Sequence, residues 1–440
     1  MKRYKEYKDS GVDWIGEIPS HWESKKIKYL VSNERNAIKP GPFGSDLKSS
    51  DIISSGIKVY TQQNVIKKDS DLGDDFISTK KFSELKNFLA KEGDFLLSTR
   101  GTIGKVYELP SNCEDGIIHP CLIKFRIDKT LVTSKIIDYV FNGCDIIQNQ
   151  IRYMSNSTII DVIYSDTLKN LSFPVCSIEE QNQIVKYLDK KTSQIETLIN
   201  KKEELIETLK SSRTKLISET VTKGLDKDVP MKDSGVDWIG EIPSNWEIKN
   251  LGYIASMIVP MRDKPTSFDG DIPWIRIEDF DGKYIEKSKT EQNVSKRLIK
   301  KMNLKIYPKG TVLCSCSCNM GETAIVSKPI ISNQTFIGIV PGSKLISEYL
   351  YYLMISNKKR LDFLSSGAIQ QYLSRTEFEH LKVQIPSIEE QMRIYKYLDE
   401  KTSQIDTLVL AIEEQIELLK KAKQKLITEV VTGKIDVTNL

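Results

Sequence analysis

The sequence predicts an α+β protein with a pseudo-two-fold tandem repeat, in which each copy is a mixed α/β domain followed by a long helix. The stretch 177–199 recurs at 387–409, where 17 of 23 positions are identical. A second stretch, 8–23, recurs at 232–247 with the single change of His21 to Asn245. The inserts between these repeats, 24–176 and 248–386, align only loosely. Near-identical frames therefore hold two dissimilar inserts.

The two copies begin with an opening segment, residues 1–23 and its repeat at 232–247. In the first copy, Gly11, Gly16 and Pro19 interrupt regular structure, while Trp14 and Trp22 supply apolar anchors. Tryptophans among turn residues favour a packing role. The alternative is a docking surface for a partner, presented once in each copy.

The two inserts have the patterns of mixed strands and short helices. Gly-led runs at 56–61 and 93–99 are typical of strands, and 131–150 carries apolar residues at helical spacing. The second insert repeats this outline at 272–277, 310–313 and 347–364. We therefore expect two domains with one general layout, spanning 1–176 and 227–386 with their opening segments.

The segments 177–226 and 387–440 are predicted to form long helices, the second followed by a C-terminal tail. Ser177 is a suitable N-cap, and the acids in the first turn complement the helix dipole. Because Gly and Pro are absent from Ile178 to Lys223, this helix could reach about 65 Å at about 1.5 Å per residue. Such a length exceeds one small globular core.

Apolar residues at alternating steps of three and four predict a narrow seam between two helices. The expected seam residues are Ile195, Leu198, Leu205, Leu209 and Leu216 in the first helix, and Ile405, Leu408, Ile412, Leu419 and Leu426 in the second. Antiparallel pairing within one chain is favoured, because linked segments have a high effective concentration for one another. Two separate coiled-coil arms for oligomerisation are the alternative.

Composition indicates a soluble, cytoplasmic protein. The sequence has no run of 18 apolar residues and no apolar signal region after Met1, so no membrane partner is expected. The seven cysteines do not suggest a disulfide framework. Net charge is only +4, but segment 248–386 has 20 basic and 13 acidic residues. This excess permits nucleic-acid binding without requiring it.

The sequence contains no complete active site, and we predict no catalytic or metal-binding residue. Cys314, Cys316 and Cys318 lack the paired spacing or histidines of a zinc site, and Leu97, Thr99 and Gly101 occupy the same places in the first insert. Small core residues are the better interpretation. Glu84-Leu-Lys86 has the letters of a nuclease motif but lies in a polar, helix-like stretch. A nucleotide phosphate loop is also missing.

Amide, hydroxyl and arginine side chains cluster at predicted turns of both inserts. Asn and Gln can pair with adenine edges and Arg with guanine, although each residue taken singly is more often a surface or turn residue. The candidate DNA-binding residues are Gln62, Gln63, Asn64, Ser98, Thr99, Arg100 and Thr102 in the first insert, and Arg276, Asn319, Asn333, Gln334, Gln370 and Gln371 in the second.

Four motifs resemble the specificity subunit of type I restriction–modification enzymes. They are Trp-Ile-Gly-Glu-Ile-Pro-x-x-Trp in both opening segments, Gly-x-x-Leu-x-Ser-x-x-Gly-x-Ile-Gly in the first insert, Pro-x-x-x-Glu-Gln at the start of the second long helix, and Lys-Leu-Ile-Thr-Glu-Val-Val-Thr-Gly-Lys-Ile-Asp ending at Asp436. The resemblance spans the chain. Residues 318–321 depart from the insert motif in part, which affects the expected loop in the second insert.

The resemblance implies two target-recognition domains, each reading half of a bipartite, asymmetric sequence in double-stranded DNA, with antiparallel helices holding the halves apart. It implies partners as well: two methyltransferase subunits that bring S-adenosylmethionine, and restriction–translocase subunits that bring ATP and Mg chemistry. This chain would bind no cofactor and would direct adenine methylation and restriction without catalysing either.

Two other classes of function stay open on the residues alone. One is a coiled-coil scaffold that assembles partners and never reads bases, and the other is a self-sufficient nuclease using Glu84. Sequence preference in the assembled complex would exclude the first, and lack of cleavage by the purified chain would exclude the second.

Overall fold

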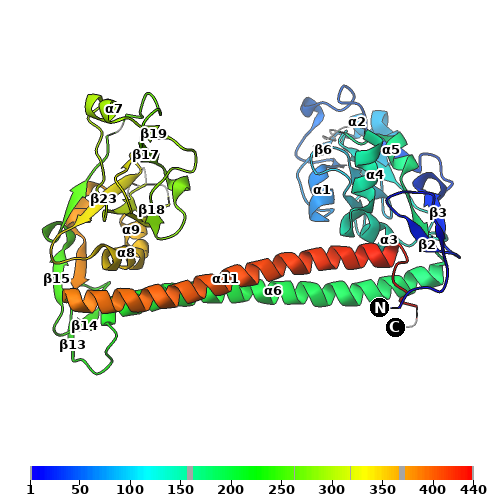
Figure 1. Cartoon of the computed structure of the whole chain (residues 1–440). Helices are drawn as coiled ribbons and strands as arrows, with labels where there is room; N and C mark the ends of the chain where they lie inside the picture. The colour runs from blue at the N-terminus through cyan, green and yellow to red at the C-terminus, as the bar shows by residue number, and fades with distance from the viewer. Residues whose placement is uncertain (1, 156–161, 262, 318, 366–371, 439–440) are drawn as a thin grey trace. The chain divides into compact units, whose positions relative to one another are not determined.

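The computed structural model describes residues 2–155, 162–261, 263–317, 319–365 and 372–438. Its backbone contacts divide the chain into two units: unit 1 is Met1–Lys202 with Glu414–Leu440, and unit 2 is Glu203–Glu413. Each unit contains one α/β domain and a part of both long helices (Figure 1). The predicted α+β fold with a tandem repeat is confirmed.

The long helices are α6 (Ile178–Lys223) and α11 (Ile388–Val431). At their starts, the hydroxyls of Ser177 and Ser387 accept the backbone N–H groups of Glu180 and Glu390, at 3.3 and 3.2 Å. Helix α6 ends before Gly224, whose φ of +74° is a left-handed conformation suited to glycine. Its 46 residues give a length of about 70 Å.

The two helices run antiparallel. Rising residue numbers on α6 pair with falling numbers on α11, as the polar contacts inside each unit show. These contacts are Glu196–Lys423 and Lys202–Gln415 in unit 1, and Arg213–Asp406 in unit 2. Just after the end of α6, Asp226 pairs with Arg393 of α11 in the same sense. Intramolecular antiparallel pairing is therefore confirmed.

One row of the predicted seam is correct and the other is wrong. Ile195, Leu209, Leu216, Ile405, Ile412, Leu419 and Leu426 are buried or half-buried. The second row lies one residue further along each helix than predicted, at Ile199 and Ile206 on α6 and at Val409 and Ile416 on α11. Leu198, Leu205 and Leu408 remain 44, 46 and 53% exposed.

The physical reason is that a central row has neighbours at both i+3 and i+4, on opposite sides of it. Leucine at i+3 and isoleucine or valine at i+4 compete for the seam in this sequence. In the structure the residues at i+4 fill the seam. The leucines at i+3 therefore lie on one flank of the helix pair.

The described residues of the unit 1 domain form four sheets. Their orders are β1-β2, β6-β5-β10-β7, β4-β11-β8-β9 and β12-β3. The strands are β1 (Tyr7–Asp9), β2 (Glu17–Pro19), β3 (Glu23–Lys26), β4 (Ile38–Pro40), β5 (Ile57–Tyr60), β6 (Phe76–Ile77), β7 (Leu89–Ala90), β8 (Phe95–Ser98), β9 (Val106–Glu108), β10 (Gly116–Ile118), β11 (Leu122–Phe125) and β12 (Ser172–Val175). The helices are α1 (Gln62–Lys67), α2 (Thr79–Leu85), α3 (Ser134–Asp138), α4 (Ile146–Ser155) and α5 (Ser165–Asn170), with short turns η1 (Ile27–Tyr29), η2 (Ser49–Asp51), η3 (Lys86–Phe88) and η4 (Tyr139–Gly143).

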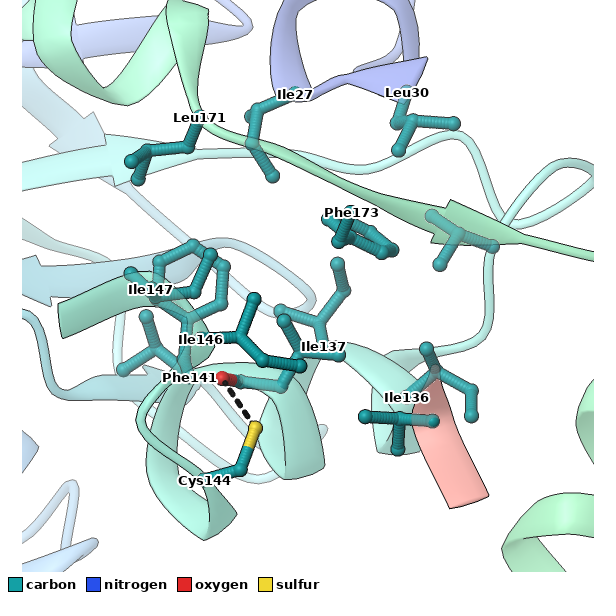
Figure 2. Close-up of a cluster of buried hydrophobic side chains, with 14 of the residues drawn as sticks. Ile27, Leu30, Ile136, Ile137, Phe141, Cys144, Ile146, Ile147, Leu171 and Phe173 are labelled. Carbon is teal, nitrogen blue, oxygen red and sulfur yellow. Dashed lines mark hydrogen bonds between the residues drawn. The ribbon is translucent and has the colours of Figure 1, made fainter. Parts of the chain in front are cut away.

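The main core of unit 1 packs α3, η4 and α4 against strands and against both long helices. Figure 2 shows Phe141 and Phe173 surrounded by isoleucines from these elements, with the Cys144 thiol donating to the Val140 carbonyl at 3.4 Å. Ile184 and Leu188 of α6 belong to the same cluster, as do Ile427 and Val430 of α11. The domain is thus fastened to its part of the helix pair by shared apolar burial.

The domain of unit 2 repeats this layout. Its sheets have the orders β13-β14, β15-β24, β16-β23-β20-β21-β18 and β19-β17-β22. The strands are β13 (Met231–Asp233), β14 (Glu241–Pro243), β15 (Glu247–Asn250), β16 (Ala255–Ile258), β17 (Ile272–Ile275), β18 (Tyr284–Ile285), β19 (Asn293–Val294), β20 (Val312–Ser315), β21 (Thr323–Val326), β22 (Ile331–Ser332), β23 (Phe336–Pro341) and β24 (Lys382–Ile385). The helices are α7 (Lys296–Lys301), α8 (Ser347–Ser356), α9 (Lys358–Ser365) and α10 (Arg375–His380), with turns η5 (Leu251–Tyr253) and η6 (Ile277–Asp279).

The opening segments pack as predicted. Trp22 and Trp246 are 1 and 0% exposed, and their indole N–H groups donate to Glu180 and Glu390 at 3.1 and 3.0 Å. The chain termini meet in unit 1, where the backbone N–H of Asp436 donates to the Lys2 carbonyl at 2.9 Å (Figure 1). The tail after α11 therefore closes onto the first opening segment.

The cysteines and the glutamate that carry the letters of a metal site and of a nuclease motif have structural roles. Cys314 and Cys316 are buried in the core of unit 2, as predicted, and Cys318 lies outside the described residues. Glu84 is a surface residue of α2 that pairs with Lys81 at 3.2 Å. Among the residues that the structure describes, no cluster of three metal-ligating side chains is found, and no helix is long and apolar enough to cross a bilayer.

Candidate nucleic-acid interface

Two separate candidate stretches of the first insert meet at one turn, which we call reading turn 1 (residues 98–104). This turn follows β8, and Gly101 and Gly104 hold φ values of +63° and +77° within it. The amide of Gln62, the first residue of α1, donates to the Arg100 carbonyl at 2.6 Å. Residues 38 positions apart thus form one surface. Arg100, Thr102 and Gln63 are exposed on or beside it.

Three other candidates of this domain are buried and hold the turn in place. Asn64 caps α1 by accepting from the Thr61 backbone N–H at 2.7 Å, and its amide donates to the Leu72 carbonyl at 2.7 Å. The Ser98 hydroxyl donates to the Thr102 carbonyl at 2.6 Å, and the Thr99 hydroxyl donates to the Cys121 carbonyl at 2.8 Å. These three buried side chains stabilise the turn. The exposed candidates of this domain are therefore Gln63, Arg100 and Thr102, and Gln62 is half-buried.

A cavity of about 360 Å³ opens beside Arg100. Phe43 and Tyr164 line it and are 80 and 69% exposed. Lys39 also lines it, with its ammonium 5.0 Å from the centre of the Phe88 ring. Phe43, Tyr164 and Lys39 are not among the DNA-binding candidates predicted from the sequence. The available signal was weak, because Phe43 is a single aromatic between Pro42 and Gly44 in an irregular stretch.

The positive charge of Arg100 affects the pKa of the nearby His119 ring. Burial lowers the pKa of His119 below its ordinary value, and the positive charge of Arg100 lowers it further, although Asp75 acts in the opposite direction. The His119 ring is therefore mostly neutral at pH 7. Its Nδ1 lies 3.3 Å from the Cys121 backbone nitrogen. Positive charge at this surface comes from Arg100 and Lys39.

The second domain has an equivalent turn, reading turn 2 (residues 315–317 and 319–321). Cys316 takes the place of Thr99, because its backbone N–H donates to Thr335 at 2.9 Å just as that of Thr99 donates to Cys121 at 3.0 Å. Gly321 has a φ of +76°, matching Gly104 despite the departure in sequence before it. Asn319 is exposed at this turn with a φ of +51°.

The other candidates of the second domain lie along the adjoining strand ends. Asn333 is half-buried, and its side-chain oxygen accepts from the Thr335 hydroxyl at 2.6 Å, whereas Gln334 is exposed. Arg276 is held by Glu278 at 2.9 Å and donates to the Thr290 hydroxyl at 3.2 Å. Arg276 is thus more restrained than Arg100. Gln370 and Gln371 lie outside the described residues.

Two domains with one frame and unlike exposed turns define a scaffold that presents two different recognition surfaces. A family model described as the type I restriction modification DNA specificity domain matches residues 19–208 and 243–418, once for each copy. Because these matches cover most of the chain, the protein belongs to the type I restriction–modification DNA specificity family.

Relatives and solved structures agree with this membership. The chain is 34% identical over 189 residues to the type I restriction enzyme MjaIX specificity subunit of Methanocaldococcus jannaschii, covering 42% of this chain and 43% of that protein. It is 25% identical over 435 residues to a proposed MjaX specificity subunit of the same organism, covering 96% of both. A match to the EcoR124I/EcoR124II specificity subunit of Escherichia coli is 22% identical over 259 residues, with 56 and 58% covered.

Among solved structures, a chain from a study of complex assembly in a type I restriction–modification system has a TM-score of 0.71 at 16% identity, covering 95% of this chain and 99% of that one. The HsdS subunit of Thermoanaerobacter tengcongensis has a TM-score of 0.53 at 15% identity, covering 95 and 98%. These structures show the same fold. The prediction of a specificity subunit, rather than of an enzyme, is confirmed by the family and its relatives.

Proposed function

We propose that this chain reads a bipartite, asymmetric DNA target, with reading turns 1 and 2 each contacting one half. The observation that supports this best is the contrast between frame and turn. The two turns share backbone hydrogen bonds, yet Arg100 and Thr102 in one correspond to Ser317 and Asn319 in the other. Two surfaces with different donors and acceptors would select different base pairs. Lys and Arg contacts to phosphates would supply salt-dependent affinity to both.

The antiparallel helix pair would set the number of unread base pairs between the halves. Both helices are continuous through the two units, and their seam is tied by an ion pair or hydrogen bond in each. A helix of about 70 Å spans on the order of 20 base pairs at about 3.4 Å each. The pair is therefore long enough to hold two half-sites on one duplex.

We also propose that two methyltransferase subunits dock on the helix pair, and that restriction–translocase subunits join them. S-adenosylmethionine, ATP and Mg would then be bound by these partners, and the assembly would act in the cytoplasm, where the DNA is. The support is a set of exposed apolar side chains: Leu198 of unit 1, and Leu205 and Leu408 of unit 2, are at least 44% exposed. Exposed leucines on one flank of a helix pair are suited to contact another helix.

Glutamate at both Leu198 and Leu408 is expected to weaken assembly with the methyltransferase subunits. These leucines are equivalent in the two repeats, so the double change alters one position in each copy. Burying a carboxylate in an apolar contact should raise the dissociation constant by at least about 30-fold. Size-exclusion chromatography with light scattering would measure this loss of assembly.

A matched control is Leu410→Glu, because Leu410 is 65% exposed but lies about 200° around α11 from Leu408. Assembly should survive this control. Equal loss in the control and the double variant would contradict docking on the leucine flank.

Arg100→Ala is expected to change base preference in one half of the target only. A guanidinium that reads a guanine contributes about 1–3 kcal/mol of discrimination, so preference at that position should fall by roughly 5- to 150-fold. Methylation profiling of cells would measure this for every position at once. The matched control is Arg375→Ala, since Arg375 is an exposed arginine of α10 that pairs with Glu379. Relaxation of both halves by Arg100→Ala would argue against two independent readers.

A further inference from the structure

The cavity beside reading turn 1 has walls that are fixed without any ligand. The Gly41 backbone N–H donates to the Leu122 carbonyl at 2.8 Å, and the Ile163 backbone N–H donates to the Thr99 carbonyl at 3.0 Å. The first bond joins segment 39–44 to segment 120–123, and the second joins segment 162–165 to the end of β8. All three segments line the cavity. The cavity is therefore pre-formed, as small-ligand sites usually are.

The inner wall is apolar and closely packed. A Cβ atom at Gly41 would lie 2.3 Å from the His119 carbonyl oxygen, so only glycine allows the 39–44 loop to approach this closely. Pro40, Pro42 and Pro120 line the same space and have no backbone N–H to offer. A ligand on this wall would be held by shape and stacking more than by hydrogen bonds.

The open side presents aromatic rings and the Arg100 guanidinium. Phe43 and Tyr164 are largely exposed, although burial of such rings is strongly favourable. Within the described part of the chain, no group forms an ion pair with the Arg100 guanidinium or a hydrogen bond with the Tyr164 hydroxyl. Aromatic faces beside an arginine suit a nucleotide, whose base stacks on rings and whose base edge and phosphate carry acceptors for the guanidinium.

We propose that this cavity takes one unstacked nucleobase of the first half-site. Phe43 and Tyr164 would provide the stacking surfaces, and Arg100 would contact the edge of the base or its phosphate. The volume of about 360 Å³ lies within the usual range of small-ligand pockets, about 300–1,000 Å³. The proposal rests on the proposed DNA-reading function and adds a recognition mode to it: a base other than the methylated adenine leaves the stack.

The second domain supports a role in specificity. Leu373 donates to the Cys316 carbonyl at 2.9 Å, as Ile163 does to Thr99, so the residues that follow are equivalent. Arg100 and Tyr164 correspond in this way to Ser317 and Ser374. The same frame therefore carries two serines where the first domain has a cation and a ring. A feature that differs between two readers of different sequences is the kind that selects a sequence.

The test uses the complex of this chain with its methyltransferase subunits and a duplex carrying the target. The fluorescent base 2-aminopurine replaces each position of the first half-site in turn, because its emission rises when it leaves the stack. We expect a rise at one position besides the methylated adenine. The double change Phe43→Ala and Tyr164→Ala should abolish that rise and weaken target binding roughly 5- to 100-fold.

Two further variants make the outcome specific. Tyr29→Ala removes another exposed tyrosine of unit 1, 62% exposed and outside the cavity, and should leave the rise intact. Tyr164→Phe keeps a ring and should also retain it, which shows that the domain folds when this residue is changed. No rise at any second position, or a rise that persists in the double variant, would overturn the proposal. A complex without any sequence preference would instead remove the proposed function itself.

Discussion

Duplicating one heptad in each long helix is expected to lengthen the unread part of the DNA target by about three base pairs. The duplicated stretches are 196–202 of α6 and 407–413 of α11, which end where the chain passes between units 1 and 2. Seven residues add about 10.5 Å of helix, and a base pair rises about 3.4 Å. A whole heptad keeps both seam rows in phase, because the seam repeats every seven residues.

Methylation profiling would measure the result as a change in spacer length with both half-sites unchanged. The control duplicates 196–202 in α6 alone, which leaves α11 one heptad too short to pair. That variant should lose the complex or its activity. If the doubly extended chain were active and its spacer unchanged, the helices would not set the distance between the half-sites.

Trp22→Ala is expected to destabilise unit 1 by about 3–5 kcal/mol. Trp22 is 1% exposed in the main core of that unit, and it packs under Gly433 at the closure of the chain termini. Its loss leaves a cavity and removes one donor from Glu180, a largely buried carboxylate that also accepts from the Tyr4 hydroxyl at 2.7 Å. For a unit of this size the melting temperature should fall by roughly 10 °C.

Differential scanning calorimetry would measure this fall, with Trp238→Ala as the matched control. Trp238 belongs to the second opening segment but is 45% exposed, stacked on Arg360 at 4.0 Å, so its removal should cost about 1 kcal/mol or less. Trp22→Phe should lie between the two, since it keeps a ring and loses the N–H. Equal, small shifts in Trp22→Ala and Trp238→Ala would mean that the opening segment does not anchor unit 1.

Much of the fold follows from repetition and periodicity in the sequence. The caps at Ser177 and Ser387, the unbroken helices and the paired opening segments are all local signals, and the structure has each of them. The helix expected over 131–150 is instead divided into α3, the wide turn η4 and α4. The break falls at Cys144 and Asp145, directly after Gly143, where a Cβ would lie 3.0 Å from Ile427. The end of η4 thus packs closely on a helix far away in sequence, which local periodicity does not reveal.

The candidate surface shows the same division between local and tertiary information. Turn residues such as Arg100 and Thr102 are predictable, because glycines and polar side chains mark the turn in the sequence. Whether Asn64 or Gln63 faces solvent depends on the capping geometry of α1. Phe43 and Tyr164 are 121 positions apart and become neighbours of one cavity only through backbone bonds among three segments. A single sequence gives no indication that Phe43 and Tyr164 line the same cavity.

The most direct test of the central claim is genome-wide adenine methylation in cells that express this chain with its methyltransferase partner, compared with cells that express the partner alone. We expect a split motif, two specific halves separated by a fixed number of unread bases, only when both proteins are present. No new motif from a complex shown to assemble would contradict the claim and would make the chain an assembly scaffold.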